Sequence, residues 1–426
     1  MKKVETFINR LKSGELDERL IDIYVDSNLV EGQKARYIEA LNNFKKLFGE
    51  NVDGIFSAPG RSEIGGNHTD HQHGEVLAAS INDDAIAVVA KTDNNKVNIL
   101  SEGYDMITID LDNLAKTDSE EGTTHSLIRG VIAKTKENGH NIGGFNAYVT
   151  SNVLSGSGLS SSAAFETLIG TILSGLYNKM SISAVEIAMI GQYAENVYFG
   201  KPCGLMDQMA CSVGSLCHID FANLEDPVVE KITFDLDNAG YSLCITDTKG
   251  SHADLTPDYA AVPAEMKAVA ACFNKSVLNE IPEEDILSHA SYIREKCGDR
   301  AFLRAIHFYE ENKRVRQEVN SLNNNDIDSF LTAVKKSGDS SYKYLQNVYT
   351  NHQVDKQNMS IALMLSEMTL GDNGVARVHG GGFAGTIQAF VKNEAVTEYK
   401  ATMDEIFGDN SCNVLKIRKY GGIKVM

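Results

Sequence analysis

Residues 57–79 read Ser-Ala-Pro-Gly-Arg-Ser-Glu-Ile-Gly-Gly-Asn-His-Thr-Asp-His-Gln-His-Gly-Glu-Val-Leu-Ala-Ala. The stretch is too polar for a core strand and too rich in glycine for a helix, so it predicts a loop between two apolar runs. It brings together the hydrogen-bonding side chains of Arg61, His68, Asp70, His71 and His73. Because function concentrates on loops that a scaffold holds in place, we interpret this loop as a candidate binding site in preference to a plain surface turn.

Length and charge limit the classes of protein that fit. A chain of 426 residues exceeds the usual size of a single core and predicts two domains. The net charge of −18 argues against nucleic acid or an anionic membrane as a partner. It leaves phosphate ligands open, since glycine loops and helix N-termini bind phosphate locally.

Membrane and secretion signals are not expected either. No apolar run reaches the ~18 residues that suggest a membrane span, and the N-terminal residues lack the apolar core of a signal peptide. Seven cysteines without a Cys-x-x-Cys pair indicate reduced thiols and a cytoplasmic protein. We expect a monomer whose partners are small molecules.

Hydrophobic periodicity predicts the main elements. Residues 1–50 have the apolar spacing of helices, and residues 76–90 read as two buried strands split by Asn82-Asp-Asp84. A further strand is expected over residues 143–150, and several more between residues 216 and 250. Helical patterns dominate residues 258–350.

A second glycine-rich stretch, Val-Leu-Ser-Gly-Ser-Gly-Leu-Ser-Ser-Ser-Ala-Ala, covers residues 153–164 between an expected strand and an expected helix. The first N–H groups of a helix have no partner within the helix and can bind an anion. The loop lacks the lysine of a P-loop and the third glycine of the dinucleotide fingerprint. A serine-rich helix cap is the alternative interpretation, but the doubled glycines favour phosphate binding.

Two shorter motifs follow. In Lys-Pro-Cys-Gly-Leu-Met-Asp-Gln, residues 201–208, Asp207 would either cap a helix or point into a site. In His-Gly-Gly-Gly-Phe, residues 379–383, three glycines predict a tight turn that leads into a strand.

Taken in order, these four motifs resemble those of the GHMP small-molecule kinases and, among them, the galactokinases. Residues 60–70, Gly-Arg-Ser-Glu-Ile-Gly-Gly-Asn-His-Thr-Asp, are similar at most fixed positions to the galactokinase signature Gly-Arg-x-Asn-x-Ile-Gly-Glu-His-Thr-Asp. The resemblance covers residues 40–426 and implies an α+β fold of two domains with the site in the cleft between them. The expected parts are a helical extension (residues 1–36), an N-terminal domain like domain 2 of ribosomal protein S5 (residues 37–230) and a ferredoxin-like C-terminal domain (residues 231–426).

The resemblance also implies ATP-dependent phosphorylation of the anomeric hydroxyl of a sugar, with D-galactose the leading substrate. Asp207 matches the family's catalytic base and Arg61 the cation beside it, while Ser162 and Glu195 match its Mg²⁺ ligands. The residues matched to sugar binding are Asn67, His68, Asp70, Gly204 and Tyr259. The residues matched to ATP binding are Gly156, Ser157, Gly158, Leu159, Ser160, Ser161, Ser162, Gly381 and Gly382.

One departure from the family pattern leaves the sugar open. Asn67 stands where the family has a glutamate that resembles a contact to the C6 hydroxyl, and a neutral amide would not repel a carboxylate there. The loop also contains His71 and His73 as possible cations. Galacturonate, or another sugar modified at C6, is therefore the alternative substrate.

Two other functions compete with catalysis on a sugar. Some galactokinase-like proteins bind sugar and ATP as sensors and lack a Ser-Ala pair in the second motif. Here Ser-Ser-Ser-Ala-Ala is intact at residues 160–164, which favours a kinase. The three histidines of the first loop would suit a metal ion, but no cysteine or second histidine-rich segment completes such a site.

Overall fold

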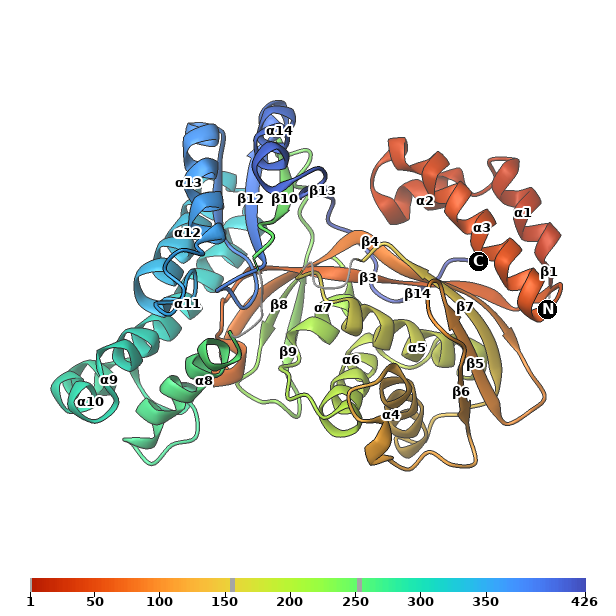
Figure 1. Cartoon of the computed structure of the whole chain (residues 1–426), viewed down its shortest axis with the longest axis horizontal. Helices are drawn as coiled ribbons and strands as arrows, with labels where there is room; N and C mark the ends of the chain where they lie inside the picture. The colour runs from red at the N-terminus through yellow and green to blue at the C-terminus, as the bar shows by residue number, and fades with distance from the viewer. Residues whose placement is uncertain (1, 154–157, 251–254) are drawn as a thin grey trace.

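The structure, a computed structural model, describes residues 2–153, 158–250 and 255–426. Within these ranges the strands form an eight-stranded sheet, a four-stranded sheet and a two-stranded ribbon, and helices pack on both larger sheets (Figure 1). This is the mixed α+β architecture that the sequence predicts.

The eight-stranded sheet is organised around two long neighbouring strands, β3 (Gly54–Gly65) and β4 (Glu75–Lys91), which pair antiparallel. Its order is β14-β3-β4-β7-β5-β6, and β8 pairs with the first residues of β4 and with β9. The other strands are β5 (Lys96–Ser101), β6 (Ile107–Asp110), β7 (Phe145–Ser151), β8 (Leu216–Asp220), β9 (Val228–Ile232) and β14 (Ile423–Lys424).

Helices α4–α7 cover the face of this sheet that points down in Figure 1. In α5 the apolar residues Leu168, Ile169, Ile172 and Leu173 recur at helical spacing and pack in one core with Phe56 of β3. The bounds are α4 (Thr124–Glu137), α5 (Ser161–Tyr177), α6 (Ala184–Tyr193) and α7 (Met206–Val213).

The N-terminal helices cover part of the opposite face, as Figure 1 shows at the red end of the chain. Phe7, Leu20, Tyr37 and Phe44 are buried there against strand residues that include Val88. The bounds are α1 (Val4–Lys12), α2 (Asp17–Tyr24) and α3 (Val30–Phe48), and the ribbon pairs β1 (Lys2–Lys3) with β2 (Asn51–Val52). The helical prediction for residues 1–50 is confirmed.

The second sheet has the antiparallel order β11-β12-β10-β13. Its strands are β10 (Tyr241–Asp247), β11 (Gly374–Val378), β12 (Thr386–Lys392) and β13 (Cys412–Leu415). The helices of this half are α8 (Thr256–Ala271), α9 (Glu283–Ser288), α10 (Ala290–Cys297), α11 (Asp299–Asn323), α12 (Ile327–Ser340), α13 (Asn358–Leu370) and α14 (Val396–Phe407).

Short helical segments complete the described chain. The 3₁₀ turns are η1 (Ser27–Leu29), η2 (Asp70–Gln72), η3 (Asp118–Glu120), η5 (Leu278–Glu280), η7 (Gly371–Asn373) and η8 (Asn393–Ala395). Two π-helical segments, η4 (Ala194–Phe199) and η6 (Ser341–Leu345), follow α6 and α12.

One hydrophobic cluster joins the two halves. It contains Ile64 and Leu77 from the first sheet together with Leu243 and Phe390 from the second. The chain also crosses back at its end, where β14 pairs with β3. The domain boundary expected between residues 230 and 231 stays a prediction.

The loop predicted from residue 57 is wrong over its first part, while the strand predicted from residue 76 is confirmed. Strand β3 continues to Gly65 and β4 begins at Glu75, so only residues 66–74 form the connection. Every residue of β3 is buried, and its polar groups find partners inside the protein. Gln388 Nε2 donates to Glu63 O at 2.8 Å and Arg377 Nη1 donates to Ile64 O at 2.6 Å. Interior partners therefore outweigh the weak strand propensity of this sequence.

The predicted break at Asn82–Asp84 is also wrong, because β4 is continuous through it. The Asp84 side chain is fully buried, where Arg36 Nη1 lies 2.6 Å and Arg418 Nη1 3.0 Å from its oxygens. Paired in this way, a carboxylate can lie within a buried strand.

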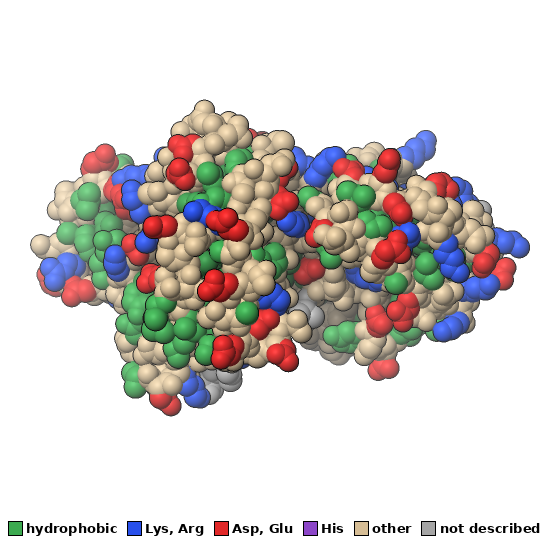
Figure 2. Space-filling view, turned by 90° about the horizontal axis from the view of Figure 1, so that it is seen from above, with side chains coloured by type: hydrophobic (Ala, Val, Ile, Leu, Met, Phe, Trp, Pro, Cys, Tyr) green, Lys and Arg blue, Asp and Glu red, His purple; other side chains and the backbone are tan. Residues whose placement is uncertain are grey.

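The surface carries both signs of charge. Figure 2 shows acidic and basic side chains interspersed over the face seen from above, with hydrophobic side chains between them. None of the helices in the described ranges combines the length and the apolar character that crossing a membrane requires.

Candidate active site

Arg61 and Asp207 form a two-pronged ion pair across 146 residues of sequence. Arg61 Nε lies 2.8 Å from Asp207 Oδ1 and Nη2 lies 3.0 Å from Oδ2. The register of β3 against β4 shifts between Pro59 and Arg61, and such bulges change the direction in which side chains point. Arg61 Nη1 also donates to Gly158 O at 2.6 Å, so it connects β3, the second glycine loop and α7.

Asp207 is held as a carboxylate that a reactant can reach. Burial by itself would raise its pKa, but the charge of Arg61 and hydrogen bonds from Arg61 and Ser160 hold the pKa below its ordinary value. Ser160 Oγ donates to Asp207 Oδ2 at 2.5 Å. The carboxylate stands in the first turn of α7, where the helix dipole favours negative charge. Its side chain is 36% exposed.

A cavity of about 530 Å³ lies beside this pair. Its wall combines β3, the loop after β3, the loop before α7, helix α8 and the triple-glycine turn. The residues of the wall include Arg61, Glu63, His68, Asp70, His71, Gly204, Lys267, Gly380 and Gly381. Three of the four sequence motifs thus meet at one cavity.

Asp70 and Gly204 approach each other closely in this wall. A Cβ on Gly204 would lie 2.1 Å from Asp70 Oδ2, so only glycine allows the observed approach. Burial raises the pKa of Asp70 to about 6, and the nearby charge of Asp207 adds to the effect. Both residues were predicted from the sequence as sugar contacts, and both face the cavity.

The histidines of the first loop form a chain of hydrogen bonds. His68 Nε2 donates to Gly381 O at 3.0 Å, and its Nδ1 lies 3.3 Å from His71 Nε2. Burial lowers the pKa of His68 to about 4 and that of His71 well below its ordinary range. His71 is therefore neutral near pH 7, and the expectation that it acts as a cation is wrong.

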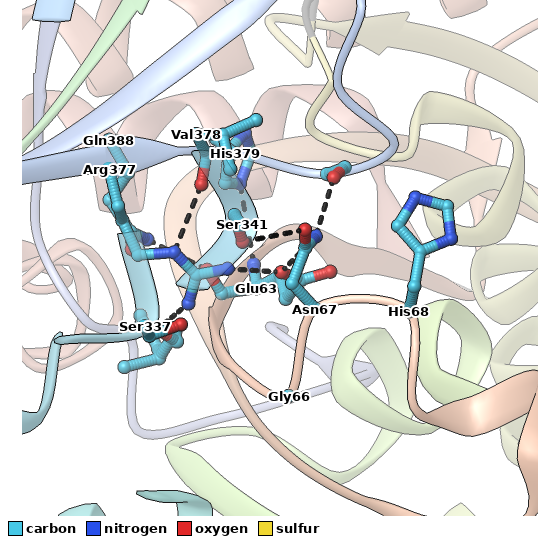
Figure 3. A network of polar contacts seen from close by, with 12 residues as sticks. Glu63, Gly66, Asn67, His68, Ser337, Ser341, Arg377, Val378, His379 and Gln388 are labelled. Carbon is cyan, nitrogen blue, oxygen red and sulfur yellow. Dashed lines mark hydrogen bonds and ion pairs between the residues drawn. The ribbon is translucent and has the colours of Figure 1, made fainter. Parts of the chain in front are cut away.

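Asn67 is not part of the cavity wall. Its side chain is fully buried, and Figure 3 shows it turned toward Glu63 and the chain after His379. Asn67 Nδ2 donates to Gly380 O at 2.7 Å and to Glu63 Oε1 at 3.0 Å. Its Oδ1 accepts from Asn347 Nδ2 at 2.8 Å. Glu63, in contrast, lines the cavity.

Tyr259 supports the triple-glycine turn. Its hydroxyl donates to Gly382 O at 2.6 Å, and its ring lies edge-on to Phe383 at 5.2 Å between centroids. A Cβ on Gly381 would lie 2.8 Å from the Tyr259 ring, and one on Gly382 would lie 2.0 Å from Asn347 O. The turn can pack this tightly only because it consists of glycines.

The second glycine loop is described in part. Gly156 and Ser157 lie outside the described residues, while Gly158 and Leu159 lead to Ser160, which precedes α5 with a left-handed φ of 58°. A Cβ on Gly158 would lie 2.7 Å from Thr386 Oγ1, so this loop passes close to the second sheet. Ser160, Ser161 and Ser162 are half-buried at the start of the helix, where N–H groups are free to bind an anion.

The expected Mg²⁺ ligand Glu195 lies beside a second buried carboxyl group, that of Glu166. Gln208 Nε2 donates to Glu195 Oε2 at 2.8 Å and to Glu166 Oε2 at 3.1 Å, and Lys201 Nζ lies 3.1 Å from Glu195 Oε1. Among the described residues, the buried Oε1 of Glu166 has no hydrogen-bond partner. Ser162 lies one turn before Glu166 on α5, so both belong to one helix face. These hard oxygen donors fit Mg²⁺.

Metal ligation by the histidine loop has no support in the structure. Across residues 2–153, 158–250 and 255–426, no group of three or more His, Cys, Asp and Glu side chains is arranged to hold a metal ion. The carboxyl groups near Gln208 would need the hydroxyl of Ser162 or ligand oxygens to complete a shell.

Sequence reasoning missed three polar residues at the site. Glu63 was missed because its segment was predicted to be a loop. In the strand that the structure shows, Glu63 lies on the same face as Arg61, two residues earlier. Lys267 lies one turn after Pro263 on α8, and both line the cavity. Lys201 opens the Asp207 motif and pairs with Glu195.

The chain is similar to known proteins over most of its length. Two family models match it, the galactokinase galactose-binding signature over residues 42–91 and the GHMP kinases N terminal domain over residues 126–215. The chain is 30% identical to the galactokinase of Clostridium acetobutylicum over 365 residues, which cover 84% of this chain and 90% of that relative. It is also 30% identical to the galactokinase of Glaesserella parasuis, over 85% of this chain and 91% of the relative.

Two solved structures show the same fold. A galactokinase of Lactococcus lactis complexed with galactose superposes with a TM-score of 0.76 at 24% identity, covering 90% of this chain and 98% of that one. The mevalonate kinase of Methanococcus jannaschii superposes with a TM-score of 0.60 at 15% identity, covering 85% and 98%.

Proposed function

The chain belongs to the galactokinase family and is a sugar kinase of the GHMP type, and from this premise we propose that it transfers the γ-phosphoryl group of ATP to the anomeric hydroxyl of D-galactose. The Arg61–Asp207 ion pair at the cavity carries the proposal, because it unites a carboxylate and a cation where a hydroxyl could be phosphorylated. Galactose itself is named for several relatives and for the structural neighbour.

Asp207 takes the proton in the proposed reaction. As the sugar O1 forms a bond to the γ-phosphorus, the bond from that phosphorus to the ADP oxygen breaks, and the O1 proton passes to an Asp207 carboxylate oxygen. Arg61 holds this carboxylate in a fixed orientation through two hydrogen bonds and contributes positive charge near the transferring group.

The start of α5 is the proposed binding site of the ATP phosphates. Free N–H groups there, with the hydroxyls of Ser161 and Ser162, suit an anionic ligand. We propose that Ser162 and Glu195 hold Mg²⁺, with the Glu166 carboxyl next to them. When bound, the ion neutralises charge on the phosphates.

Asp70 is the proposed acceptor of hydrogen bonds from the ring hydroxyls at C3 and C4. The backbone of Gly204 packs against the same carboxyl, so the two residues would define one side of the sugar site. His68 and Tyr259 would support the sugar site by holding the triple-glycine turn through Gly381 O and Gly382 O.

Galacturonate remains a second candidate because of one observation. Lys267 lines the cavity and supplies a positive charge that could bind a carboxylate at C6. We therefore place both sugars in the test.

The deciding experiment is ADP release in a coupled assay with ATP, Mg²⁺ and a panel of sugars that includes D-galactose and D-galacturonate. Asp207→Asn serves as the matched negative control for background ATP hydrolysis. Efficient turnover of galactose supports the proposal, and turnover of galacturonate alone replaces it with the second candidate. Tight galactose binding without sugar-dependent ADP release would instead indicate a sensor.

A further inference from the structure

Compared with the galactokinase signature, this chain has an amide and a carboxylate exchanged between two positions of the first motif. The galactokinase signature has Asn at the fourth place of its first motif and Glu at the eighth, whereas this chain has Glu63 and Asn67 at those places. The two side chains are in contact, since Asn67 Nδ2 donates to Glu63 Oε1 at 3.0 Å. The exchange thus keeps one carboxylate and one amide in a single hydrogen-bonded pair.

Asn67 has no polar group left for a ligand. Both donors of its amide are used, by Glu63 Oε1 and Gly380 O. Its Oδ1 accepts from Asn347 Nδ2 at 2.8 Å and from Ser341 Oγ at 3.2 Å. The amide is therefore a buried connector between β3, the segment after α12 and the triple-glycine turn (Figure 3).

Glu63 has the opposite arrangement. Its Oε1 accepts from Arg377 Nη2 at 2.7 Å as well as from Asn67. Among the described residues, no hydrogen bond reaches Oε2, and the side chain lines the cavity with 5% of its surface exposed. Arg377 is fully buried and also held by Ile64 O and Val378 O, so it fixes the Glu63 carboxyl in place. One oxygen is anchored and the other is available to a ligand.

We propose that Glu63 is a specificity-determining residue of the sugar site: its carboxylate accepts a hydrogen bond from the C6 hydroxyl of galactose and disfavours a sugar with a carboxylate at C6. The proposal rests on the proposed function. It assigns to Glu63 the role that the sequence suggested for position 67, because Glu63 faces the cavity and Asn67 does not. Repulsion between two carboxylates then opposes the attraction that Lys267 would offer to galacturonate.

The charge state of Glu63 sets the conditions of the test. Burial raises its pKa to about 7, although Arg377 and Arg61 act against the rise. Assays at pH 8 therefore compare the ionised carboxylate with its neutral amide.

The test compares galactose, galacturonate and 6-deoxy-D-galactose in the wild type and in Glu63→Gln. We expect the wild type to prefer galactose over the 6-deoxy sugar by about 10–100-fold in kcat/KM, as for a hydrogen bond to a charged group. In Glu63→Gln this preference should fall by about tenfold or more, the galacturonate to galactose ratio should rise by a similar factor, and kcat for galactose should change little. Glu284→Gln on an exposed part of α9 is the matched control and should behave as wild type.

A double substitution distinguishes specificity from structural support. Glu63→Asn alone should lose the preference for the C6 hydroxyl, and Glu63→Asn combined with Asn67→Glu should not restore it, because the side chain at position 67 does not line the cavity. Restoration by the double variant would assign the preference to position 67 and overturn the proposal. Unchanged sugar ratios in a folded Glu63→Gln protein would overturn the proposal. If neither variant folds, the wild-type ratio of kcat/KM for galactose and 6-deoxy-galactose decides the question. Equal values for the two sugars would also overturn the proposal. A wild type that does not phosphorylate galactose at all would refute the proposed function, a result separate from these.

Discussion

Asp70 lines the cavity and Asp207 is bonded to Arg61 in the cavity wall, yet the pKa values of the two carboxyl groups move in opposite directions. Partial burial acts to raise the pKa of both carboxyl groups, but only Asp207 has an arginine bonded to both of its oxygens. The pKa of Asp70 rises to about 6 while that of Asp207 falls. Environments that separate the pKa values of two neighbouring carboxyls also separate their roles.

Asp207→Asn should lower kcat about 10²–10⁴-fold, the usual contribution of a positioned base, with little change in sugar binding. The amide keeps the size of the side chain and can still accept from Arg61 or Ser160, so the fold should persist. Steady-state kinetics and calorimetric titration with galactose measure the two effects separately. Asp226→Asn, in an exposed loop, is the control. A near-normal kcat would remove Asp207 from the mechanism.

Asp70 predicts a pH effect on sugar binding. It is ionised above its pKa of about 6, and protonation removes its best acceptor sites, so KM for galactose should rise as the pH falls below 6. The rise should approach about tenfold per pH unit. kcat should not follow, because the pKa of Asp207 is held below its ordinary value. Profiles of KM and kcat from pH 5 to pH 8 test this.

Glu63 titrates in the same cavity, so the profile needs a variant that lacks this group. In Glu63→Gln any step near the Glu63 pKa of about 7 should disappear, and the step near 6 should remain. A KM that stays flat down to pH 5 in both proteins would exclude Asp70 as an acceptor for the sugar.

At the scale of elements, the loop before α7 can approach Asp70 closely only because residue 204 is a glycine. Gly204→Ala would put a Cβ 2.1 Å from Asp70 Oδ2, so the carboxyl must move. The far end of a side chain can shift at small cost in stability, but a displaced binding group should lower kcat/KM for galactose about 10–100-fold. Thermal unfolding and kinetics on the same sample separate the two.

The control for Gly204→Ala is Gly32→Ala. Gly32 lies inside α3, and beyond its own stretch of helix no heavy atom of the described residues lies within 4 Å of an added Cβ. Alanine should therefore keep full activity and stabilise the helix by about 0.5–1 kcal/mol. If Gly204→Ala also retains full activity, the close approach to Asp70 has no role in sugar binding.

The elements that the sequence predicted well are those whose pattern is local. Helices over residues 1–50 follow apolar spacing, and so does α5. Strand β3 escaped prediction because both of its faces are buried and its polar groups pair with β11 and β12, more than 300 residues away. No local pattern contains that information, and the same holds for the continuous β4.

The candidate site was likewise predictable only in part. The four motifs are visible as short strings, and their resemblance to a family supplied Asp207, Arg61 and Asp70. Whether Glu63 or Asn67 faces the cavity was not predictable, because it depends on bulges in β3 and on Arg377 from the second sheet. The sequence predicted Asn67 as the residue that faces the sugar, whereas in the structure Glu63 lines the cavity and Asn67 does not.

At the scale of the whole molecule, Asp84 joins parts that lie far apart in the chain. Tyr24 of α2 donates to its Oδ2 at 2.8 Å, Arg36 of α3 and Arg418 near the C-terminus form ion pairs with it, and Ser57 of β3 also donates to it. Burial alone would raise the pKa of Asp84, but the two arginines hold it below its ordinary value. The N-terminal helices thus complete a buried polar cluster in addition to covering the sheet.

Asp84→Asn should therefore destabilise the fold by about 3–5 kcal/mol at pH 7, the cost of leaving buried cations without their counter-charge. Because the folded pKa is lowered, the contribution of Asp84 is present above the unfolded pKa of about 3.9 and is lost as the pH falls below it. The difference in stability between wild type and variant should thus shrink at low pH. Urea unfolding at pH 7 and near pH 3 measures it.

The neighbouring Asp83 provides a control, because its carboxyl pKa is raised while that of Asp84 is lowered. Asn152 Nδ2 donates to its Oδ1 at 3.0 Å, and its pKa is raised to about 6 by burial and then by the charge of Asp84. A carboxyl group whose pKa is raised by folding destabilises the folded protein when it ionises. At pH 7, Asp83→Asn should therefore leave the protein equally or more stable. If Asp83→Asn and Asp84→Asn destabilise the protein alike, polar burial in general would explain the loss. If only Asp84→Asn does, the loss comes from the ion pairs that join the N-terminal helices and the C-terminal segment to the sheet.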